Sequence, residues 1–241
     1  MPILVWNYIH LLDTKSRDPK RIIKNMFPKI KICCISSIAE AKTAIQFGAS
    51  AVGLVGKMPS GPGVISDELI RKIARTVPPP IATFLLTSET SAEAIIKHHG
   101  LTQTNTIQIV DSLELGSYKL LRESLPTIKL VQVVHVIDEK SIDKAIEVSN
   151  HVDAILLDSG NPALKVKVLG GTGLTHNWKL SRKIRDTVKI PVFLAGGLHA
   201  GNVKEAIAVV EPFGIDLCSG VRTNGLLDTG KLEKFIIAAM D

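Results

Sequence analysis

Aromatic side chains are scarce in this sequence. Phe, Trp and Tyr together make up 4% of the 241 residues, whereas hydrophobic residues of all kinds make up 45%. The apolar content is enough for the core of one large domain, but that core must be built from Val, Ile, Leu and Ala. Aliphatic strands of this kind are typical of a parallel sheet that is covered by helices on both faces.

Cysteine is also rare, and its spacing fits neither a disulfide framework nor a zinc site. The three cysteines are Cys33, Cys34 and Cys218, and the sequence contains no CxxC or HExxH motif. The adjacent Cys33 and Cys34 are poorly placed to bridge each other. We therefore expect a protein of a reducing compartment, with the cytoplasm as the default, and no metal site.

The sequence lacks a recognisable targeting signal and a membrane span. The apolar run at residues 1–12 has no basic region before it and no small-residue cleavage site after it. It is also too short to cross a bilayer. We expect no association with membranes.

A nucleic-acid partner is not expected either. The formal net charge is +6, but the basic residues are dispersed apart from a cluster between Lys15 and Lys24. The sequence shows neither a recognised nucleic-acid motif nor aromatic residues interleaved among basic ones. A solvated surface is the simplest interpretation, and attraction of anionic substrates such as phosphates is the alternative.

What the sequence does contain is one unit repeated eight times. From Lys29 onward, a short β-rich run is followed by a loop and by an amphipathic segment of helical period. The predicted strands are 30–34, 51–55, 81–86, 106–109, 130–134, 154–157, 192–195 and 215–218. The predicted helices are 38–47, 67–76, 91–98, 113–122, 139–148, 178–187, 202–210 and 231–239.

Strict alternation of strand and helix predicts a parallel sheet. Eight units in 241 residues favour a closed single-domain (β/α)8 barrel, or TIM barrel, over an open doubly wound sheet. The absence of a GxGxxG motif after the first strand also counts against a dinucleotide fold. We assign residues 29–241 to the barrel and residues 1–28 to a short N-terminal extension.

Two of the predicted strands end in reactive side chains. The run KIC ends in Cys33, and the run ILLD ends in Asp158. The C-terminal ends of barrel strands face the active site, so the thiol and the carboxyl would share one face. They favour proton-transfer chemistry, with a thiol that can become a thiolate and a carboxyl whose pKa is raised by burial. The alternatives are a small buried cysteine and a turn aspartate.

Glycine-rich motifs follow the sixth, seventh and eighth predicted strands. AGGLHAGNV at 195–203 opens the seventh helix, and CSGV at 218–221 ends the eighth strand. Barrel loops at these two places often hold a phosphate through backbone N–H groups, although tight turns are the alternative. We predict that four residues bind a phosphate: Gly196, Gly197, Ser219 and Gly220. Gly171 and Gly173 of GGTG lie in a long loop, which we expect to contact the substrate.

The motifs KIC, EAKTAIQFGASAVGLV (40–55), ILLDS, GGTG, LAGGLHAGNVKEAI and GIDLCSGV resemble, in this order, those of the phosphoribosylanthranilate isomerase family of tryptophan biosynthesis. The resemblance implies an Amadori rearrangement without cofactor or metal. The substrate would be N-(5'-phosphoribosyl)anthranilate and the product 1-(o-carboxyphenylamino)-1-deoxyribulose 5-phosphate. It also implies that Asp158 is the general acid, Cys33 is the general base, and the protein is a monomer or a homodimer.

The departures from the family pattern concentrate where the anthranilate would lie. The loop MPSGPGV at 58–64 lacks the arginine that receives the anthranilate carboxylate in the family, and Arg222 stands where glutamate is common. In one hypothesis Arg222, or Lys57, binds the carboxylate and the activity is retained. In a second hypothesis the same pair acts on a different phosphorylated aminoaldose. A non-catalytic sugar-phosphate-binding barrel is a third, which the presence of both Cys33 and Asp158 disfavours.

A further departure lies beside the expected base. Cys34 occupies the position of the family's glycine after KIC. Because side chains alternate along a strand, we expect Cys33 and Cys34 to point in opposite directions.

Overall fold

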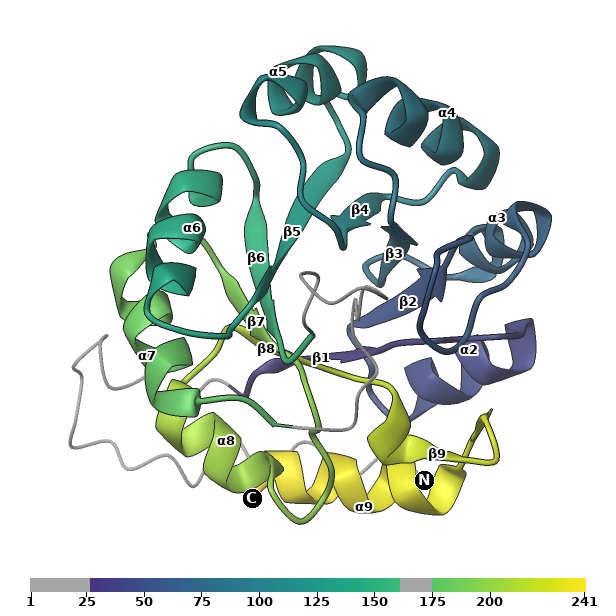
Figure 1. Cartoon of the computed structure of the whole chain (residues 1–241). Coiled ribbons are helices and arrows are strands. Elements are labelled where there is room, and N and C mark those ends of the chain that lie inside the picture. The colour runs from purple at the N-terminus through teal and green to yellow at the C-terminus, as the bar shows by residue number, and fades with distance from the viewer. Residues whose placement is uncertain (1–26, 161–174) are drawn as a thin grey trace, which may run out of the picture.

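Eight parallel strands form a closed barrel in this protein. The computed structural model describes residues 27–160 and 175–241. The strands follow one another in chain order around the barrel, and the last of them pairs with the first. Figure 1 shows the helices arranged around the ring of strands. The predicted (β/α)8 barrel is confirmed.

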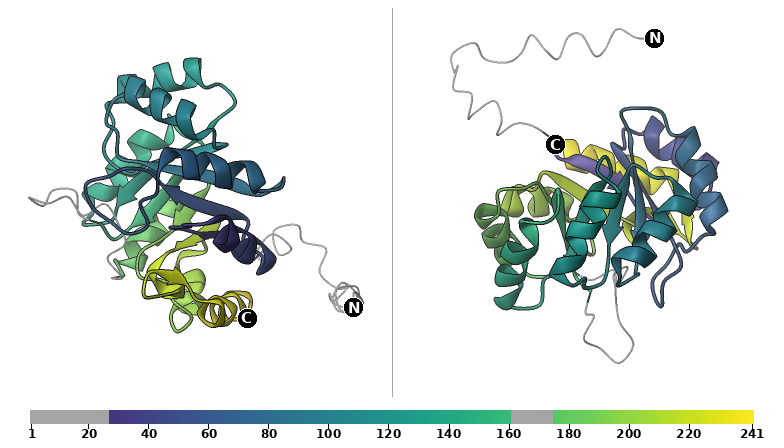
Figure 2. Two further views of the ribbon diagram at one scale, coloured as in Figure 1. Left: turned by 90° about the vertical axis from the view of Figure 1, so that its right-hand side faces the viewer. Right: turned by 90° about the horizontal axis from the view of Figure 1, so that it is seen from above.

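The strands of the barrel are β1 (Lys29–Ile32), β2 (Ala51–Val55), β3 (Ala82–Thr87), β4 (Thr106–Ile109), β5 (Lys129–His135), β6 (Ala154–Asp158), β7 (Val192–Leu194) and β8 (Gly214–Leu217). The surrounding helices are α2 (Ile38–Gln46), α3 (Asp67–Thr76), α4 (Ala92–Thr102), α5 (Leu115–Ser124), α6 (Lys140–Ser149), α7 (Trp178–Thr187), α8 (Val203–Val210) and α9 (Thr229–Met240). The last helix, α9, packs against α8 and lies between α8 and α2 in the ring (Figures 1 and 2).

Every predicted strand and helix corresponds to an observed one, with shifts of a few residues at the ends. A short 3-10 helix η2 (Ser219–Val221) and a hairpin of β9 (Arg222–Thr223) with β10 (Leu226–Leu227) separate β8 from α9, and the sequence analysis did not foresee them. Residues 1–26 of the predicted extension lie outside the described residues, as do Gly171 and Gly173.

Local sequence explains where the helices begin, and α3 is a clear case. The side chain of Ser66 accepts a hydrogen bond from the backbone N–H of Leu69, which satisfies one of the free donors at the helix start. Two acidic residues in the first turn and Arg75 in the last complement the helix dipole. Ile70 and Ile73 lie on the buried face of α3, which packs against the barrel.

The core has two layers, which follow from the alternation of side chains along each strand. In β3, Leu85 faces outward and packs in the layer between sheet and helices, while Phe84 and Leu86 face the barrel interior. Phe84 contacts Phe193 edge to face inside the barrel, with ring centroids 6.0 Å apart. Each fully buried aliphatic or aromatic side chain contributes roughly 1.5–3 kcal/mol, so both layers stabilise the frame that carries the strand ends.

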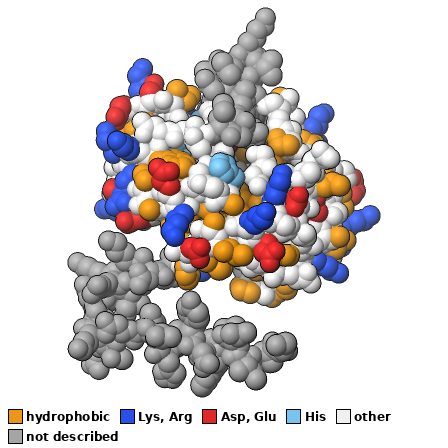
Figure 3. Space-filling view, turned by 90° about the horizontal axis from the view of Figure 1, so that it is seen from below, with side chains coloured by type: hydrophobic (Ala, Val, Ile, Leu, Met, Phe, Trp, Pro, Cys, Tyr) orange, Lys and Arg blue, Asp and Glu red, His pale blue; other side chains and the backbone are white. Residues whose placement is uncertain are grey.

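The surface is charged with both signs. Figure 3 shows Lys and Arg side chains interspersed with Asp and Glu on one face of the molecule. Several form surface ion pairs, such as Arg185 with Glu211 at 2.7 Å and Lys183 with Glu139 at 2.9 Å. This mixture supports a solvated surface as the explanation of the net charge. Across 27–160 and 175–241, no helix combines the length and the apolar character that crossing a membrane requires.

Candidate active site

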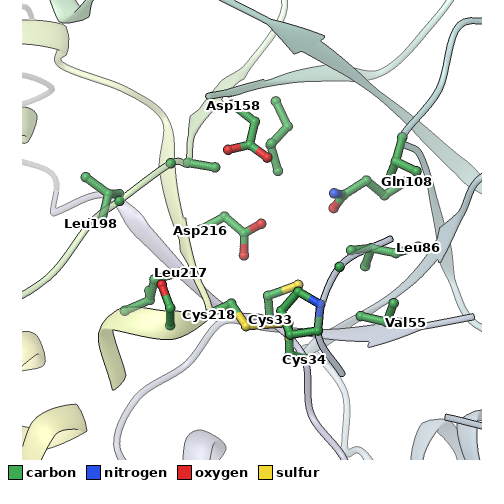
Figure 4. Close-up of a pocket in the computed structure, with 18 of the residues that line it drawn as sticks. Cys33, Cys34, Val55, Leu86, Gln108, Asp158, Leu198, Asp216, Leu217 and Cys218 are labelled. Atoms are coloured by element: carbon green, nitrogen blue, oxygen red, sulfur yellow. A yellow bond between two sulfur atoms is a disulfide. The ribbon is translucent and has the colours of Figure 1, made fainter. Parts of the chain in front are cut away.

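A pocket opens at the C-terminal ends of the strands. It is lined by residues from every strand except β5, counting the segments that directly follow the strands. Of the residues predicted from the sequence, the structure brings five together in its lining: Cys33, Asp158, Gly196, Gly197 and Ser219. Figure 4 shows Cys33, Asp158, Gln108 and Asp216 projecting into the cavity from different sides.

The carboxyl group of the pocket is that of Asp158, the last residue of β6. Its side chain is buried, with 8% exposed. Burial raises the pKa of Asp158 to about 6, although a 2.7 Å hydrogen bond from the Ser159 backbone N–H acts in the opposite direction. A carboxyl with this pKa holds its proton in a useful fraction of molecules near neutral pH, so it can act as a general acid.

The thiol of the pocket is that of Cys33, which directly follows β1. Burial raises the pKa of Cys33 to about 11; the ammonium of Lys31 acts against this rise, and the carboxylate of Asp216 adds to it. A base at this position must be a thiolate. Lys31 is therefore the group whose positive charge stabilises the thiolate form of Cys33.

Close packing brings Lys31 and Cys33 together. A Cβ atom placed on Gly53 of β2 would lie 2.8 Å from Cys33 Sγ and 3.1 Å from Lys31 Nζ. Both atoms thus occupy the space that a side chain on Gly53 would need. The absence of that side chain leaves room for the cation beside the thiol.

A buried ion pair between Lys31 and Asp216 completes the polar interior. Lys31 Nζ lies 2.7 Å from Asp216 Oδ2 and 5.1 Å from the centroid of the Phe84 ring. Burial lowers the pKa of Lys31, but the charges of Asp216 and Cys33 outweigh this effect and hold the pKa above its ordinary value. The other oxygen, Asp216 Oδ1, has no hydrogen-bond partner within the described part of the chain, and Asp216 lines the pocket.

Neither Lys31 nor Asp216 is among the residues predicted from the sequence. A signal for them existed, because a lysine inside KIKI and an aspartate inside GIDL are charged residues in otherwise apolar strands. Such residues are rarely buried unless they are paired.

The loops after β7 and β8 meet at the predicted phosphate site. Gly196 and Gly197 adopt positive φ angles of 81° and 62°, a conformation that glycine tolerates best. A side chain on Gly220 would collide with the carbonyl oxygen of Leu198, so glycine at this position lets the two loops touch. In the described part of the chain, the backbone N–H groups of Gly196 and Gly197 have no acceptor. Gly220 is not among the residues that line the pocket.

Cys34 differs from its expected orientation. Its φ angle is 60°, in the left-handed region, because β1 ends at Ile32 and the chain turns. Both Cys33 and Cys34 therefore line the pocket, and the prediction from strand alternation is wrong. The turn also lets Cys34 pair with Cys218 in a disulfide with a Cα–Cα distance of 5.9 Å. This pairing was not predicted from the sequence, in which 184 residues separate the two cysteines.

Arg222 lies outside the pocket lining and is bound to other groups. Its Nη1 donates to Glu40 Oε1 at 3.1 Å and to the Gly225 carbonyl at 2.9 Å, and its Nη2 donates to the carbonyl oxygens of Cys33 and Cys34. In this arrangement the guanidinium holds the end of β1. Binding a substrate carboxylate would require Arg222 to release Glu40. The alternative cation, Lys57, is exposed and also lies outside the pocket lining.

Comparison with known proteins identifies relatives along nearly the whole described chain. Residues 30–238 match a protein family described as N-(5'phosphoribosyl)anthranilate (PRA) isomerase. The curated N-(5'-phosphoribosyl)anthranilate isomerase 2 of Methanosarcina mazei is 38% identical over 210 residues, which cover 86% of this chain and 92% of that protein.

Solved structures show the same similarity. The phosphoribosyl anthranilate isomerase of Thermotoga maritima is 31% identical, with a TM-score of 0.74 over 88% of this chain and 98% of that one. A phosphoribosyl anthranilate isomerase in complex with reduced 1-(o-carboxyphenylamino)-1-deoxyribulose 5-phosphate is 29% identical, with a TM-score of 0.71 and the same coverage.

Proposed function

Because this chain belongs to the N-(5'-phosphoribosyl)anthranilate isomerase family, we propose that Asp158 and Cys33 are the acid and the base of its reaction. The reaction is the isomerisation of N-(5'-phosphoribosyl)anthranilate to 1-(o-carboxyphenylamino)-1-deoxyribulose 5-phosphate, a step of tryptophan biosynthesis. The observation that carries the assignment is the presence of one buried carboxyl and one buried thiol in the same pocket.

Asp158 donates a proton in the first step. Its carboxyl group protonates the ring oxygen of the ribose, the bond between C1′ and that oxygen breaks, and the nitrogen lone pair forms a Schiff base. The pKa of about 6, raised mainly by burial, supports this role. A proton transfer of this kind contributes roughly 10²–10⁴-fold to the rate.

Cys33 accepts a proton in the second step. Its thiolate removes the proton from C2′, and the electron pair moves toward the iminium nitrogen to give an enol amine. The enol then becomes the ketone of the product as C1′ gains a proton. Lys31, packed against Sγ beside Gly53, stabilises the thiolate that this step requires.

The phosphate is bound by the loops after β7 and β8. The N–H groups of Gly196 and Gly197 point to this role, and η2 places Ser219 and Gly220 at the start of a short helix next to them. Gly171 and Gly173, which follow β6 in the sequence, complete the proposal as substrate contacts. The proposal includes no cofactor.

The cytoplasm is the proposed location, in keeping with a soluble biosynthetic family. Such a compartment keeps cysteine pairs largely as thiols, and a Cα–Cα distance of 5.9 Å between Cys34 and Cys218 suits either redox form. The oligomeric state is a monomer or a homodimer. A structure described as mutually generated monomers of a dimeric isomerase from Thermotoga maritima is 27% identical, with a TM-score of 0.71.

Steady-state turnover of N-(5'-phosphoribosyl)anthranilate by the purified protein tests the proposal. We expect turnover by the wild type and a loss of at least ~10²-fold in kcat for both Cys33→Ala and Asp158→Asn. Both variants should still bind the reduced product, because the phosphate loops are untouched.

Other outcomes separate the alternatives. Binding of ribose 5-phosphate without turnover of phosphoribosylanthranilate would favour a different aminoaldose substrate. Binding that neither variant affects, with no turnover of any related aminoaldose, would favour a non-catalytic barrel. Turnover that survives Cys33→Ala would remove Cys33 from the mechanism.

A further inference from the structure

One buried amide in the pocket has an unused hydrogen-bonding atom. Gln108, on β4, is 3% exposed, and its side chain points into the cavity (Figure 4). Its Oε1 has no hydrogen-bond partner within the described residues. A buried polar atom without a partner is costly, so such an atom in a binding pocket points to a ligand group.

Gln132 on the neighbouring strand β5 shows what a structural glutamine looks like in this barrel. Its Oε1 accepts a 2.6 Å hydrogen bond from Tyr118, and its Nε2 donates to three carbonyl oxygens, those of Ile109, Asp111 and Val133. Gln132 is therefore fully satisfied by the fold. Gln108, one strand away and equally buried, is not.

The position of Gln108 identifies which part of the substrate it would meet. In an eight-stranded ring β4 lies opposite β8, and the phosphate loops follow β7 and β8. Cys33 and Asp158 lie between, at the ends of β1 and β6. A substrate with its phosphate at β7 and β8 and its sugar at the acid and base extends its amine substituent toward β2, β3 and β4.

The lining at that end suits a benzene ring with one polar edge. Val55, Met58, Leu86 and Val110 supply apolar contacts there. The polar side chains among the lining residues of β2 to β4 and the loop after β2 are Gln108 and Ser60. No arginine or lysine lines the described pocket at all.

We propose that Gln108 recognises the anthranilate part of the substrate through its side-chain amide. Nε2 donates to the ortho carboxylate, and Oε1 accepts from the N–H that joins the ring to the sugar. An anthranilate presents a donor and an acceptor side by side, and a primary amide presents the complementary pair. This inference rests on the proposed function and names the specificity-determining residue of the same site.

The same contact helps the chemistry as well as the binding. When the ribose ring opens, the nitrogen becomes part of a protonated Schiff base and its N–H carries positive charge. Hydrogen bonds to charged groups are stronger than neutral ones, so Oε1 of Gln108 binds the iminium better than the substrate. A contact of this kind lowers the barrier as well as KM.

Two ligands test the proposal by direct binding. The first is reduced 1-(o-carboxyphenylamino)-1-deoxyribulose 5-phosphate, and the second is its phenylamino counterpart without the carboxylate. We expect the wild type to bind the first at least ~10-fold more tightly. Gln108→Leu should bind the two ligands nearly equally, and Gln108→Glu should bind the first more weakly than the second, because two carboxylates repel each other.

Ser60→Ala is the matched control, since it removes the other polar side chain at the same end. It should keep the wild-type ratio between the two ligands. Inorganic phosphate should compete equally well in all variants, which shows that each is folded. If Gln108→Leu fails to fold, Gln108→Glu decides the question alone. A wild-type ratio in the Gln108 variants overturns the proposal, and so does a ratio that collapses only in Ser60→Ala.

These binding measurements are separable from the proposed catalytic roles. Loss of turnover in the wild type, with the carboxylate preference intact, would overturn the acid and base assignment and leave Gln108 as the recognition residue. Normal turnover in the wild type, with no carboxylate preference, would overturn the role of Gln108 alone. In the first case the ratio of the two ligand affinities is unchanged, and in the second case kcat is unchanged.

Discussion

At the scale of single residues, the pocket contains two groups whose proton affinities are both raised by burial. Asp158 gains a pKa of about 6 and Cys33 a pKa of about 11. In the proposed mechanism, the reactive form carries a proton on the carboxyl of Asp158 and a negative charge on the sulfur of Cys33. The positive charge of Lys31 lowers the pKa of Cys33 and so stabilises the thiolate. Asp216 pairs with Lys31, but its own negative charge raises the pKa of Cys33 and partly opposes this effect.

Titration of the Cys33 thiol measures the opposing effects of Lys31 and Asp216 on its pKa. In protein whose other two cysteines are paired, the thiolate absorbance near 240 nm should rise with a midpoint at about pH 11. Lys31→Met removes the cation that stabilises the thiolate, so the midpoint should rise. Asp216→Asn removes a negative charge, so the midpoint should fall. A midpoint that is the same in all three proteins would contradict the assigned electrostatics.

Substitution of Arg222 distinguishes two roles of this residue, positioning the end of β1 and binding the substrate carboxylate. If the guanidinium positions the end of β1 through the carbonyls of Cys33 and Cys34, Arg222→Ala should lower kcat with little change in KM. Removing one partner of its partly buried pair with Glu40 should also lower the free energy of unfolding, by about 1–3 kcal/mol. Arg222→Lys serves as the control that keeps the charge but not the planar fork. A rise in KM at constant kcat would instead support the carboxylate role predicted from the sequence.

At the scale of elements, the segment after β1 is held to the segment after β8. Cys34 bonds to Cys218, and Arg222 reaches the same turn from the start of β9. The left-handed conformation of Cys34 is unfavourable for a residue with a side chain, and a glycine would adopt it more easily. The cross-link and the arginine both stabilise that turn.

Unfolding with and without reductant tests the contribution of the disulfide. A disulfide typically contributes about 2–4 kcal/mol, so reduction of Cys34–Cys218 should lower the free energy of unfolding by about that amount. Urea unfolding followed by circular dichroism measures the change. Cys218→Ser is the control, and its stability should not respond to the reductant. An oxidised wild type that unfolds at the same urea concentration as the reduced protein would show that the bond constrains little.

At the scale of the whole molecule, one chain supplies every group in the described pocket. The proposed acid and base, the loops proposed to bind phosphate, and Gln108 lie on or directly after β1, β4, β6, β7 and β8 of a single closed barrel. We therefore predict that these groups act within a single copy of the chain.

Activity measured over a range of dilutions tests this independence. We expect the turnover number to stay constant from micromolar to nanomolar protein, whatever the association state. Sedimentation at the higher concentrations would report that state. A turnover number that falls as a dimer dissociates would show that the partner chain contributes to the site.

The sequence by itself predicted the fold correctly, and its motifs pointed to the family and the reaction that the comparisons support. The eightfold alternation of apolar strands and amphipathic helices predicts a barrel, because eight such units in one domain suit a closed parallel sheet better than an open one. Residues that end strands, such as Cys33 and Asp158, were also predictable, since the barrel places every C-terminal strand end on one face.

Only the tertiary structure decided which distant groups meet. Lys31 with Asp216, Cys34 with Cys218 and Arg222 with Glu40 are each joined across more than 180 residues. The closure of β8 on β1 creates all three contacts, and no local pattern encodes it. The open Oε1 of Gln108 is likewise visible only once its neighbours are in place, because satisfaction of a hydrogen bond is a property of the packed structure.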